Sequence, residues 1–130
     1  MGESGFLIDS NAVIDYLGNN LPNYGMNFMN EVIDQIPNLS VITKIEVLGY
    51  NAPPKHYSIL SEFMNDSNIL ELSEEVVNHC IEIRKTYSIK LPDAIIAATA
   101  LTHDLSLITR NMQDFEKIPE LNILNPHLNL

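Results

Sequence analysis

The stretch FLIDSNAVIDYL, residues 6–17, joins a short apolar run to the start of a helical pattern. Phe6–Ile8 is apolar and strand-like, and Asp9 ends it abruptly. Over Ser10–Leu17 the apolar residues recur with helical spacing, which places them on one face. A buried carboxylate is costly unless it is paired or binds a cation. Asp9 is therefore either the cap of the next helix or the neighbour of something positive.

Short apolar runs and helical patterns keep alternating along the rest of the chain. Four further strands are expected: 39–42, 68–72, 105–109 and 121–124. Helices are expected over about 25–35, 43–48, 55–65, 74–86 and 92–103, with a helical turn at 111–115. Thr43 and Ser73 are the predicted N-caps of two of these helices. The alternation predicts a three-layer α/β/α sandwich with a five-stranded parallel sheet, as one domain over residues 1–130.

The composition fits one globular domain of ordinary polarity. The chain has 130 residues, of which 45% are hydrophobic and 18% charged. It lacks an apolar run near the ~20 residues of a membrane span. The first residues lack the basic start and long apolar core of a signal peptide, so we expect a cytoplasmic protein with no membrane role. Cys80 is the only cysteine, which excludes an internal disulfide, and its helical surroundings predict a core residue.

The net charge of −10 argues against general nucleic-acid binding, because phosphate contacts need lysine and arginine. It suits a basic partner or a cation. The chain has seven basic residues: Lys44, Lys55, Arg84, Lys85, Lys90, Arg110 and Lys117.

Four acids are expected at one edge of the predicted sheet. Asp9 ends the first strand, and Glu46 lies in the first turns after the second strand. Asp93 lies in the first turn of helix 92–103, and Asp114 comes shortly after the fourth strand. Ligands of open α/β sheets bind outside the carboxyl ends of the strands. Each acid alone is better explained as a cap, a helix-dipole partner or a solvated side chain, and it is the coincidence of four that favours a functional site.

Four converging carboxylates would repel one another and raise their pKa values. A divalent cation removes that penalty, and Mg²⁺ prefers oxygen ligands together with several waters. Mn²⁺ accepts the same ligands. Such a site can activate water for attack on a phosphodiester.

Four stretches of the chain, taken together, have a familiar order. They are FLIDSNAVIDYL (6–17), SVITKIEVLGY (40–50), LPDAIIAATAL (91–101) and LSLITRNMQDFEKI (105–118), followed by LNILNP (121–126). In these stretches the sequence resembles the PIN-domain family of ribonucleases and, within it, the VapC-type toxins of type II toxin–antitoxin pairs. The resemblance implies a PIN-like fold and Mg²⁺- or Mn²⁺-dependent cleavage of RNA by an activated water.

The resemblance also implies roles for particular residues. Asp9, Glu46, Asp93 and Asp114 would be the acidic metal-binding and catalytic set. The side chains around them would be Ser10, Asn11, Thr109 and Asn111, which orient carboxylates or waters. Asn11 and Asn111 are equally well explained as turn and cap residues. Lys44 and Arg110 flank two acid motifs and either contact RNA phosphates or are ordinary surface charges.

The implied partners are a structured RNA, a small antitoxin with a basic segment, and a second copy of the chain. Helices around 26–33 and 55–64 are the expected contacts of that homodimer, although an apolar face such as 26–33 is more often core. Asp15 is expected to be solvated. The four histidines show no metal-binding spacing.

Two other interpretations stay open at this point. A PIN-like domain can be catalytically silent and serve as a binding module, which intact acids at all four motifs argue against. Another magnesium-dependent phosphoryl-transfer α/β enzyme is the second alternative. The aspartate phosphatase pattern needs an acid two residues after the nucleophile, and Asn11 stands there instead.

Overall fold

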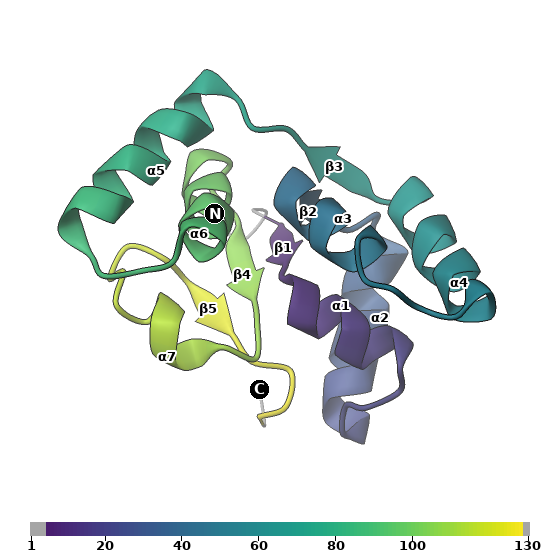
Figure 1. Cartoon of the computed structure of the whole chain (residues 1–130). Helices are drawn as coiled ribbons and strands as arrows, with labels where there is room; N and C mark the ends of the chain where they lie inside the picture. Colours follow the sequence, from purple (N-terminus) through teal and green to yellow (C-terminus); the bar gives the residue numbers. More distant parts are fainter. Residues whose placement is uncertain (1–4, 129–130) are drawn as a thin grey trace.

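A parallel sheet of five strands organises the chain, and its strands follow the short apolar runs of the sequence (Figure 1). The computed structural model describes residues 5–128. The strands are β1 (Phe6–Ile8), β2 (Asn38–Ser40), β3 (Asn68–Leu70), β4 (Ser106–Ile108) and β5 (Ile123–Leu124). Their order is β3-β2-β1-β4-β5, and every neighbouring pair is parallel. The predicted five-stranded parallel sheet is confirmed.

Helices connect the strands, as the alternation in the sequence predicts. They are α1 (Ser10–Leu17), α2 (Asn23–Asp34), α3 (Val41–Leu48), α4 (Pro54–Asn65), α5 (Glu74–Thr86), α6 (Leu91–Thr102) and α7 (Met112–Phe115). Among residues 5–128, every helix is too short or too polar to cross a bilayer. The single domain predicted over 1–130 includes residues 1–4 and 129–130, which lie outside the described residues, so its full extent stays a prediction.

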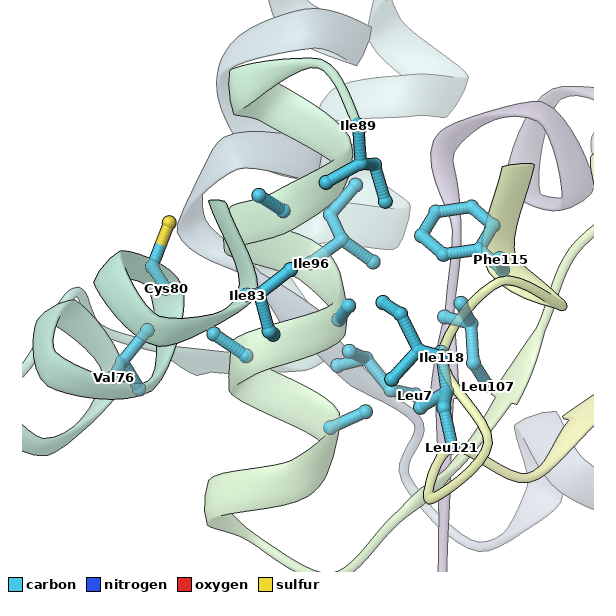
Figure 2. Close-up of a cluster of buried hydrophobic side chains, with 14 residues drawn as sticks. Leu7, Val76, Cys80, Ile83, Ile89, Ile96, Leu107, Phe115, Ile118 and Leu121 are labelled. Carbon is cyan, nitrogen blue, oxygen red and sulfur yellow. The ribbon is translucent and has the colours of Figure 1, made fainter. Parts of the chain in front are cut away.

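Two hydrophobic cores lie on opposite faces of the sheet, because successive strand residues point to opposite sides. Leu7 of β1 belongs to the core formed with α5, α6 and α7, part of which Figure 2 shows. Ile8, the next residue, belongs to the core formed with α1, α2, α3 and α4. The three predicted layers are therefore present. Cys80 packs in the first core, as its helical pattern indicates.

The second strand and the cap that follows it differ from the prediction. The strand ends at Ser40, and Val41 and Ile42 already belong to α3. The Ser40 hydroxyl accepts a hydrogen bond from the Ile42 N–H at 3.1 Å, so Ser40 is the N-cap. The predicted cap, Thr43, is wrong: it is fully buried inside α3. The β-branched residues 41–43 favour a strand only weakly. Packing in the tertiary structure therefore decides whether they form a strand or a helix.

The apolar face of α2 belongs to the core rather than to a free surface. Met29 and Val32 are buried against the sheet, and Met26, Phe28 and Ile33 pack around them. The sequence predicted this helix as one contact of a homodimer. Its apolar side chains pack inside the chain instead.

The order of the strands marks one crevice. The chain runs outward from β1 through β2 to β3, and then returns to place β4 on the other side of β1. Open α/β sheets bind ligands at such a reversal point. Ile8 pairs with Ile108, and the Asp9 N–H donates to the Ile108 carbonyl at 2.9 Å. The residues that follow β1 and β4 are therefore held side by side.

Candidate active site

Asp9 occupies the N-cap position of α1, with extended backbone angles. Its carbonyl accepts from the N–H groups of Ala12 and Val13, both at 3.1 Å. Its carboxylate accepts from the neighbouring Ser10 N–H at 2.8 Å through Oδ1. Only 4% of the residue is exposed. The cap interpretation is thus correct for the backbone, but it leaves the second carboxylate oxygen to other partners.

That second oxygen, Oδ2, is held by side chains from both strand ends. The Thr109 hydroxyl donates to it at 2.7 Å, and the Asn11 amide donates at 3.1 Å. All of these donors are neutral. Burial, more than any other effect, raises the pKa of Asp9 above its usual value, the Glu46 charge adds to this, and the hydrogen bonds oppose it. Asp9 is a buried carboxylate whose contacts stabilise its charge only in part.

Glu46 lies on the exposed surface of α3 and reaches back toward Asp9. The Ser10 hydroxyl donates to Glu46 Oε1 and lies 3.3 Å from the Thr43 hydroxyl. Ser10 thus connects the start of α1 to α3. The prediction that Ser10 orients a carboxylate matches this contact.

Asp93 lies in the first turn of α6 and is half-buried. Its pKa is raised to about 6, first by burial and then by the charges of Asp9, Asp114 and Glu46. Lys90 lowers it and does not outweigh them. Asp93 is therefore within electrostatic reach of the other three predicted acids.

Asp114 lies on α7, whose N-cap is Asn111. The Asn111 side chain accepts from the Asp114 N–H at 3.4 Å and donates to the Asp114 carboxylate at 3.0 Å. Both interpretations of Asn111, cap and carboxylate orienter, therefore describe the same side chain. The Asn111 N–H donates to the Thr109 hydroxyl at 3.0 Å, so this turn is tied to the partner of Asp9.

These side chains surround one open pocket, called the acid pocket below. It is lined by Asp9, Ser10, Asn11, Ile14, Glu46, Val47, Tyr50, Asp93 and Asn111. The sequence did not single out Ile14, Val47 and Tyr50. Ile14 lies five residues after Asp9 on α1, and Tyr50 ends the SVITKIEVLGY motif, so motif proximity was the signal available for them.

The donor set of the acid pocket fits a hard cation. Three of its lining residues are carboxylates, and Asp114 adds a fourth charge through Asn111. Within residues 5–128, groups of three or more His, Cys, Asp or Glu side chains arranged to hold an ion are absent. Glu46 accepts from Ser10, and Asp114 accepts from Asn111. Mg²⁺ commonly takes one or two carboxylates and completes its shell with water, so it does not need all four acids as direct ligands.

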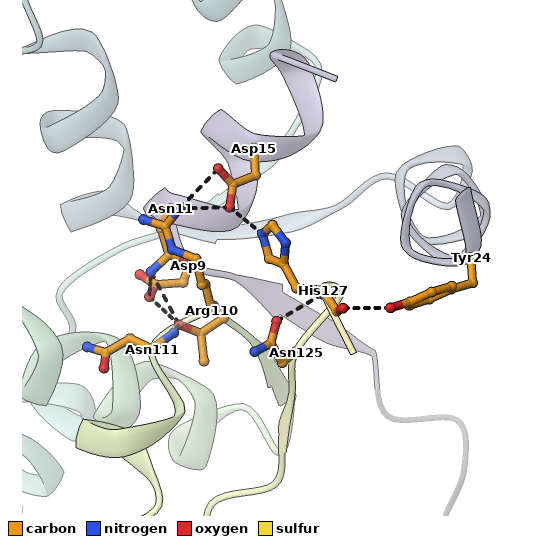
Figure 3. A network of polar contacts seen from close by, with 9 residues as sticks. Asp9, Asn11, Asp15, Tyr24, Arg110, Asn111, Asn125 and His127 are labelled. Atoms are coloured by element: carbon orange, nitrogen blue, oxygen red, sulfur yellow. Dashed lines mark hydrogen bonds and ion pairs between the residues drawn. The ribbon is translucent and has the colours of Figure 1, made fainter. Parts of the chain in front are cut away.

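One prediction about a charged residue stays a prediction, and another needs correction. The Arg110 guanidinium, a candidate RNA contact, lies 3.2 Å from a carboxylate oxygen of Asp15 while its side chain is 57% exposed, so the RNA contact is still untested. Asp15 was expected to be solvated, yet its side chain is only 8% exposed. It also accepts from His127 at 2.8 Å (Figure 3). Asp15 follows Ala12 by three residues, so helical spacing places it on the buried face of α1. We expected it to be solvated because it is charged.

Comparison with known proteins gives one family and several similar structures. The family model described as the PIN domain matches residues 6–121. A curated protein named Ribonuclease VapC, from Rickettsia bellii (strain RML369-C), is 42% identical over 41 residues. That match covers 32% of this chain and 31% of the relative, so the chain matches about a third of the relative's length.

Solved structures of similar shape cover nearly the whole chain. A toxin–antitoxin complex from Klebsiella pneumoniae contains a chain that is 32% identical, with a TM-score of 0.71 and coverage of 94% of this chain and 98% of that one. FitAcB from Neisseria gonorrhoeae gives 25% identity and a TM-score of 0.79, with coverage of 95% and 99%. DNA-bound VapBC from Salmonella typhimurium gives 23% identity and a TM-score of 0.80, with coverage of 95% and 98%.

Proposed function

The chain belongs to the PIN domain family, and from that premise we propose that it is a metal-dependent endoribonuclease acting as the toxin of a toxin–antitoxin pair. The observation that carries the proposal is one open pocket lined by Asp9, Glu46 and Asp93, with Asn111 of the same pocket bonded to Asp114. The names of two similar proteins, a ribonuclease and a toxin–antitoxin complex, support the same assignment.

Asp9 and Asp93 are the proposed direct metal ligands, with Glu46 and Asp114 completing the acidic set. When bound, Mg²⁺ or Mn²⁺ supplies an activated water and stabilises the leaving oxygen of the phosphodiester. The chain's own contribution is to hold these carboxylates in place. Thr109 and Asn11 fix Asp9 Oδ2, Ser10 fixes Glu46, and Asn111 fixes Asp114.

Contacts with RNA phosphates are proposed for the lysines beside the acids. Lys90 lies near enough to lower the pKa of Asp93, and the Lys117 amine lies 3.9 Å from Asp114. Lys44 is exposed on α3, two residues before Glu46, and stays a candidate. With a net charge of −10, the protein has little general attraction for RNA, so a structured RNA recognised by shape is the proposed substrate.

A small antitoxin protein with a basic segment is the proposed partner in the cell, where we place the protein in the cytoplasm. An apolar groove adjoins the acid pocket, and the two share Ile14 and Tyr50. The other residues that line this groove are Leu17, Gly18, Ala52, His56, Ile59 and Leu60. Ile59→Glu is expected to weaken binding of the protein encoded by an adjacent short gene, while RNA cleavage is kept. A homodimer is also proposed, and light scattering at micromolar concentration tests it.

The test of the nuclease proposal compares Asp9→Asn and Asp93→Asn with the wild type. Both variants remove one ligand charge at nearly constant shape. Cleavage of total RNA in Mg²⁺ should fall at least about 100-fold, more than is typical for losing a side chain that only supports a ligand. Asp66→Asn, at an exposed position after α4, makes the same chemical change and should cleave normally.

The RNA cleavage assay, together with Mg²⁺ binding and phosphate release, separates the rival interpretations. A wild-type protein that binds Mg²⁺ but cleaves no RNA would identify a silent binding module. Full cleavage by Asp9→Asn would show that this carboxylate is structural and would overturn the proposal. Release of phosphate from small phosphate esters, without RNA cleavage, would favour a different phosphoryl-transfer enzyme.

A further inference from the structure

Asp15 is a buried carboxylate that the proposed reaction does not use. It lies on α1, and both of its carboxylate oxygens face partners from distant parts of the chain (Figure 3). Arg110 Nη1 donates to Oδ1 at 3.3 Å and to Oδ2 at 3.2 Å. Because a carboxylate only accepts, the His127 Nε2–H donates to Oδ2, at 2.8 Å. These three residues are called the Asp15 cluster below.

Arg110 is attached to α1 at two points. Its guanidinium binds Asp15, and its backbone N–H donates to Asn11 Oδ1 at 2.9 Å. Asn11 and Asp15 are four residues apart, so they lie one turn apart on the same face of the helix. Arg110 therefore holds the turn of Thr109, Arg110 and Asn111 against two successive turns of α1, as a clamp.

Asn11 transmits this clamp to the acid pocket. A side-chain amide has one accepting and one donating end, so the partner of one end decides where the other points. The Arg110 N–H occupies the Asn11 oxygen, which leaves the Asn11 nitrogen to donate to Asp9 Oδ2 at 3.1 Å. A shift of Arg110 would release this amide, whereas Thr109 is held by its own N–H, which donates to the Leu124 carbonyl at 2.9 Å.

The C-terminal segment supplies the third member of the cluster and is itself fixed. The His127 N–H donates to Asn125 Oδ1 at 2.9 Å, and the Tyr24 hydroxyl donates to the His127 carbonyl at 2.7 Å. A side chain at Gly25 would place its Cβ 2.0 Å from the Pro126 carbonyl oxygen, so only glycine permits this approach of α2. The segment that carries His127 is therefore fixed against α2, and from there the His127 side chain contacts Asp15.

From these contacts we infer that Asp15 is a positioning residue for the metal-binding carboxylate of Asp9, acting through Arg110 and Asn11. The pair also stabilises the fold, because it joins an Asp15 side chain that is only 8% exposed to Arg110, whose side chain is 57% exposed. In addition, the pair fixes the direction of the Asn11 amide, which together with Thr109 holds Asp9 Oδ2.

The inference rests on the proposed metal site, so its test measures metal binding and side-chain geometry apart from RNA cleavage. Asp15→Asn keeps the shape and removes the charge, and Arg110→Gln removes the guanidinium at a largely exposed position. Asp66→Asn is the matched control. Mn²⁺ affinity is measured by titration calorimetry, and the Arg110 N–H and Asn11 side-chain signals are followed by NMR in metal-free protein.

Asp15→Asn should weaken Mn²⁺ binding about tenfold, at the low end of the range for residues that support metal ligands. Arg110→Gln should do the same, and the double variant should add little, because the two residues act as one unit. The Asn11 side-chain signals should move in both single variants, and the Arg110 N–H signal should move in Asp15→Asn. If Asp15→Asn fails to fold, Arg110→Gln alone decides the result.

Three outcomes would overturn the inference. The first is an Mn²⁺ affinity within twofold of wild type in both variants, and the second is an unchanged Arg110 N–H signal. The third is weakened binding in Asp15→Asn but normal binding in Arg110→Gln, because Asp15 would then not act through Arg110. A wild-type protein that binds no Mn²⁺ would contradict the proposed function instead, while the NMR signals would still report whether the clamp exists.

Discussion

Asp9 and Asp15 are two buried aspartates at the start and in the body of one helix, with 4% and 6% of the residues exposed. Their surroundings differ. Asp15 contacts the guanidinium of Arg110 and the ring of His127, whereas Asp9 contacts a hydroxyl, an amide and a backbone N–H. A buried charge needs an opposite charge. Asp15 finds a cation, Arg110, within the chain, whereas Asp9 contacts neutral donors and lies near the charge of Glu46, which is why we propose a metal ion as its partner.

Asparagine at each position should break the symmetry between the two aspartates. In metal-free protein, Asp9→Asn should leave the melting temperature unchanged or raise it, because asparagine caps a helix as well and repulsion among the acids falls. Asp15→Asn should lower the free energy of unfolding by about 1–3 kcal/mol, since two charge-assisted hydrogen bonds lose their anionic acceptor. Thermal melting of both variants beside Asp66→Asn measures this. Equal destabilisation by the two changes would mean that both aspartates are structural.

The hydroxyl of Thr109 tests whether neutral donors hold Asp9 in a useful orientation. Thr109→Val removes the 2.7 Å hydrogen bond to Asp9 at constant shape. Mg²⁺-dependent cleavage should fall about 10–100-fold, as for other side chains that orient metal ligands. Thr109→Ser keeps the hydroxyl and should retain most activity. Thr99→Val, where the buried hydroxyl only bonds the Ile95 carbonyl within α6, is the matched control and should cleave RNA normally.

Asp93 should make stability depend on pH in the direction opposite to that of an ordinary ion-paired aspartate. Its pKa in the folded chain is about 6, raised from 3.8, so the folded state holds this proton more tightly than the unfolded state. Its contribution to stability is therefore greatest at low pH and is lost as pH rises from about 4 to about 6. The melting temperature of metal-free Asp93→Asn should gain on wild type across that range. A constant difference between the two proteins would contradict the shift.

Lysines near the acids should contribute slightly to RNA binding. They should contribute more than Arg110, whose charge Asp15 already neutralises. In an Asp9→Asn background, binding to single-stranded RNA is measured at several salt concentrations. Lys90→Gln should reduce the magnitude of the slope of the log binding constant against log salt concentration by about 0.7, the loss of one phosphate contact. Lys55→Gln, on exposed α4, is the control and should leave the slope unchanged. Equal slopes for Lys90→Gln and Lys55→Gln would remove Lys90 from the RNA contacts.

Local patterns in the sequence were sufficient for the sheet and for the placement of its acids. An apolar run followed by a helical period marks a strand and the helix after it, and parallel strands bring their carboxyl ends to one edge. Asp9, Glu46, Asp93 and Asp114 could be assigned to that edge before any contact was known. These signals lie within a few residues of one another, which is why the sequence alone carries them.

The partners of each charged side chain came only from the tertiary structure. Asp15 looked solvated and Arg110 looked free for RNA because their contact joins positions 95 residues apart in sequence. The cap at Ser40 rather than Thr43 depended on where β2 stops pairing with β3, at Ser40 and Leu70. Likewise, the pairing of Ile8 with Ile108 sets Thr109 beside Asp9. Hydrogen bonds and ion pairs act over a few ångströms, so register and packing choose their members, and composition or periodicity along the chain does not.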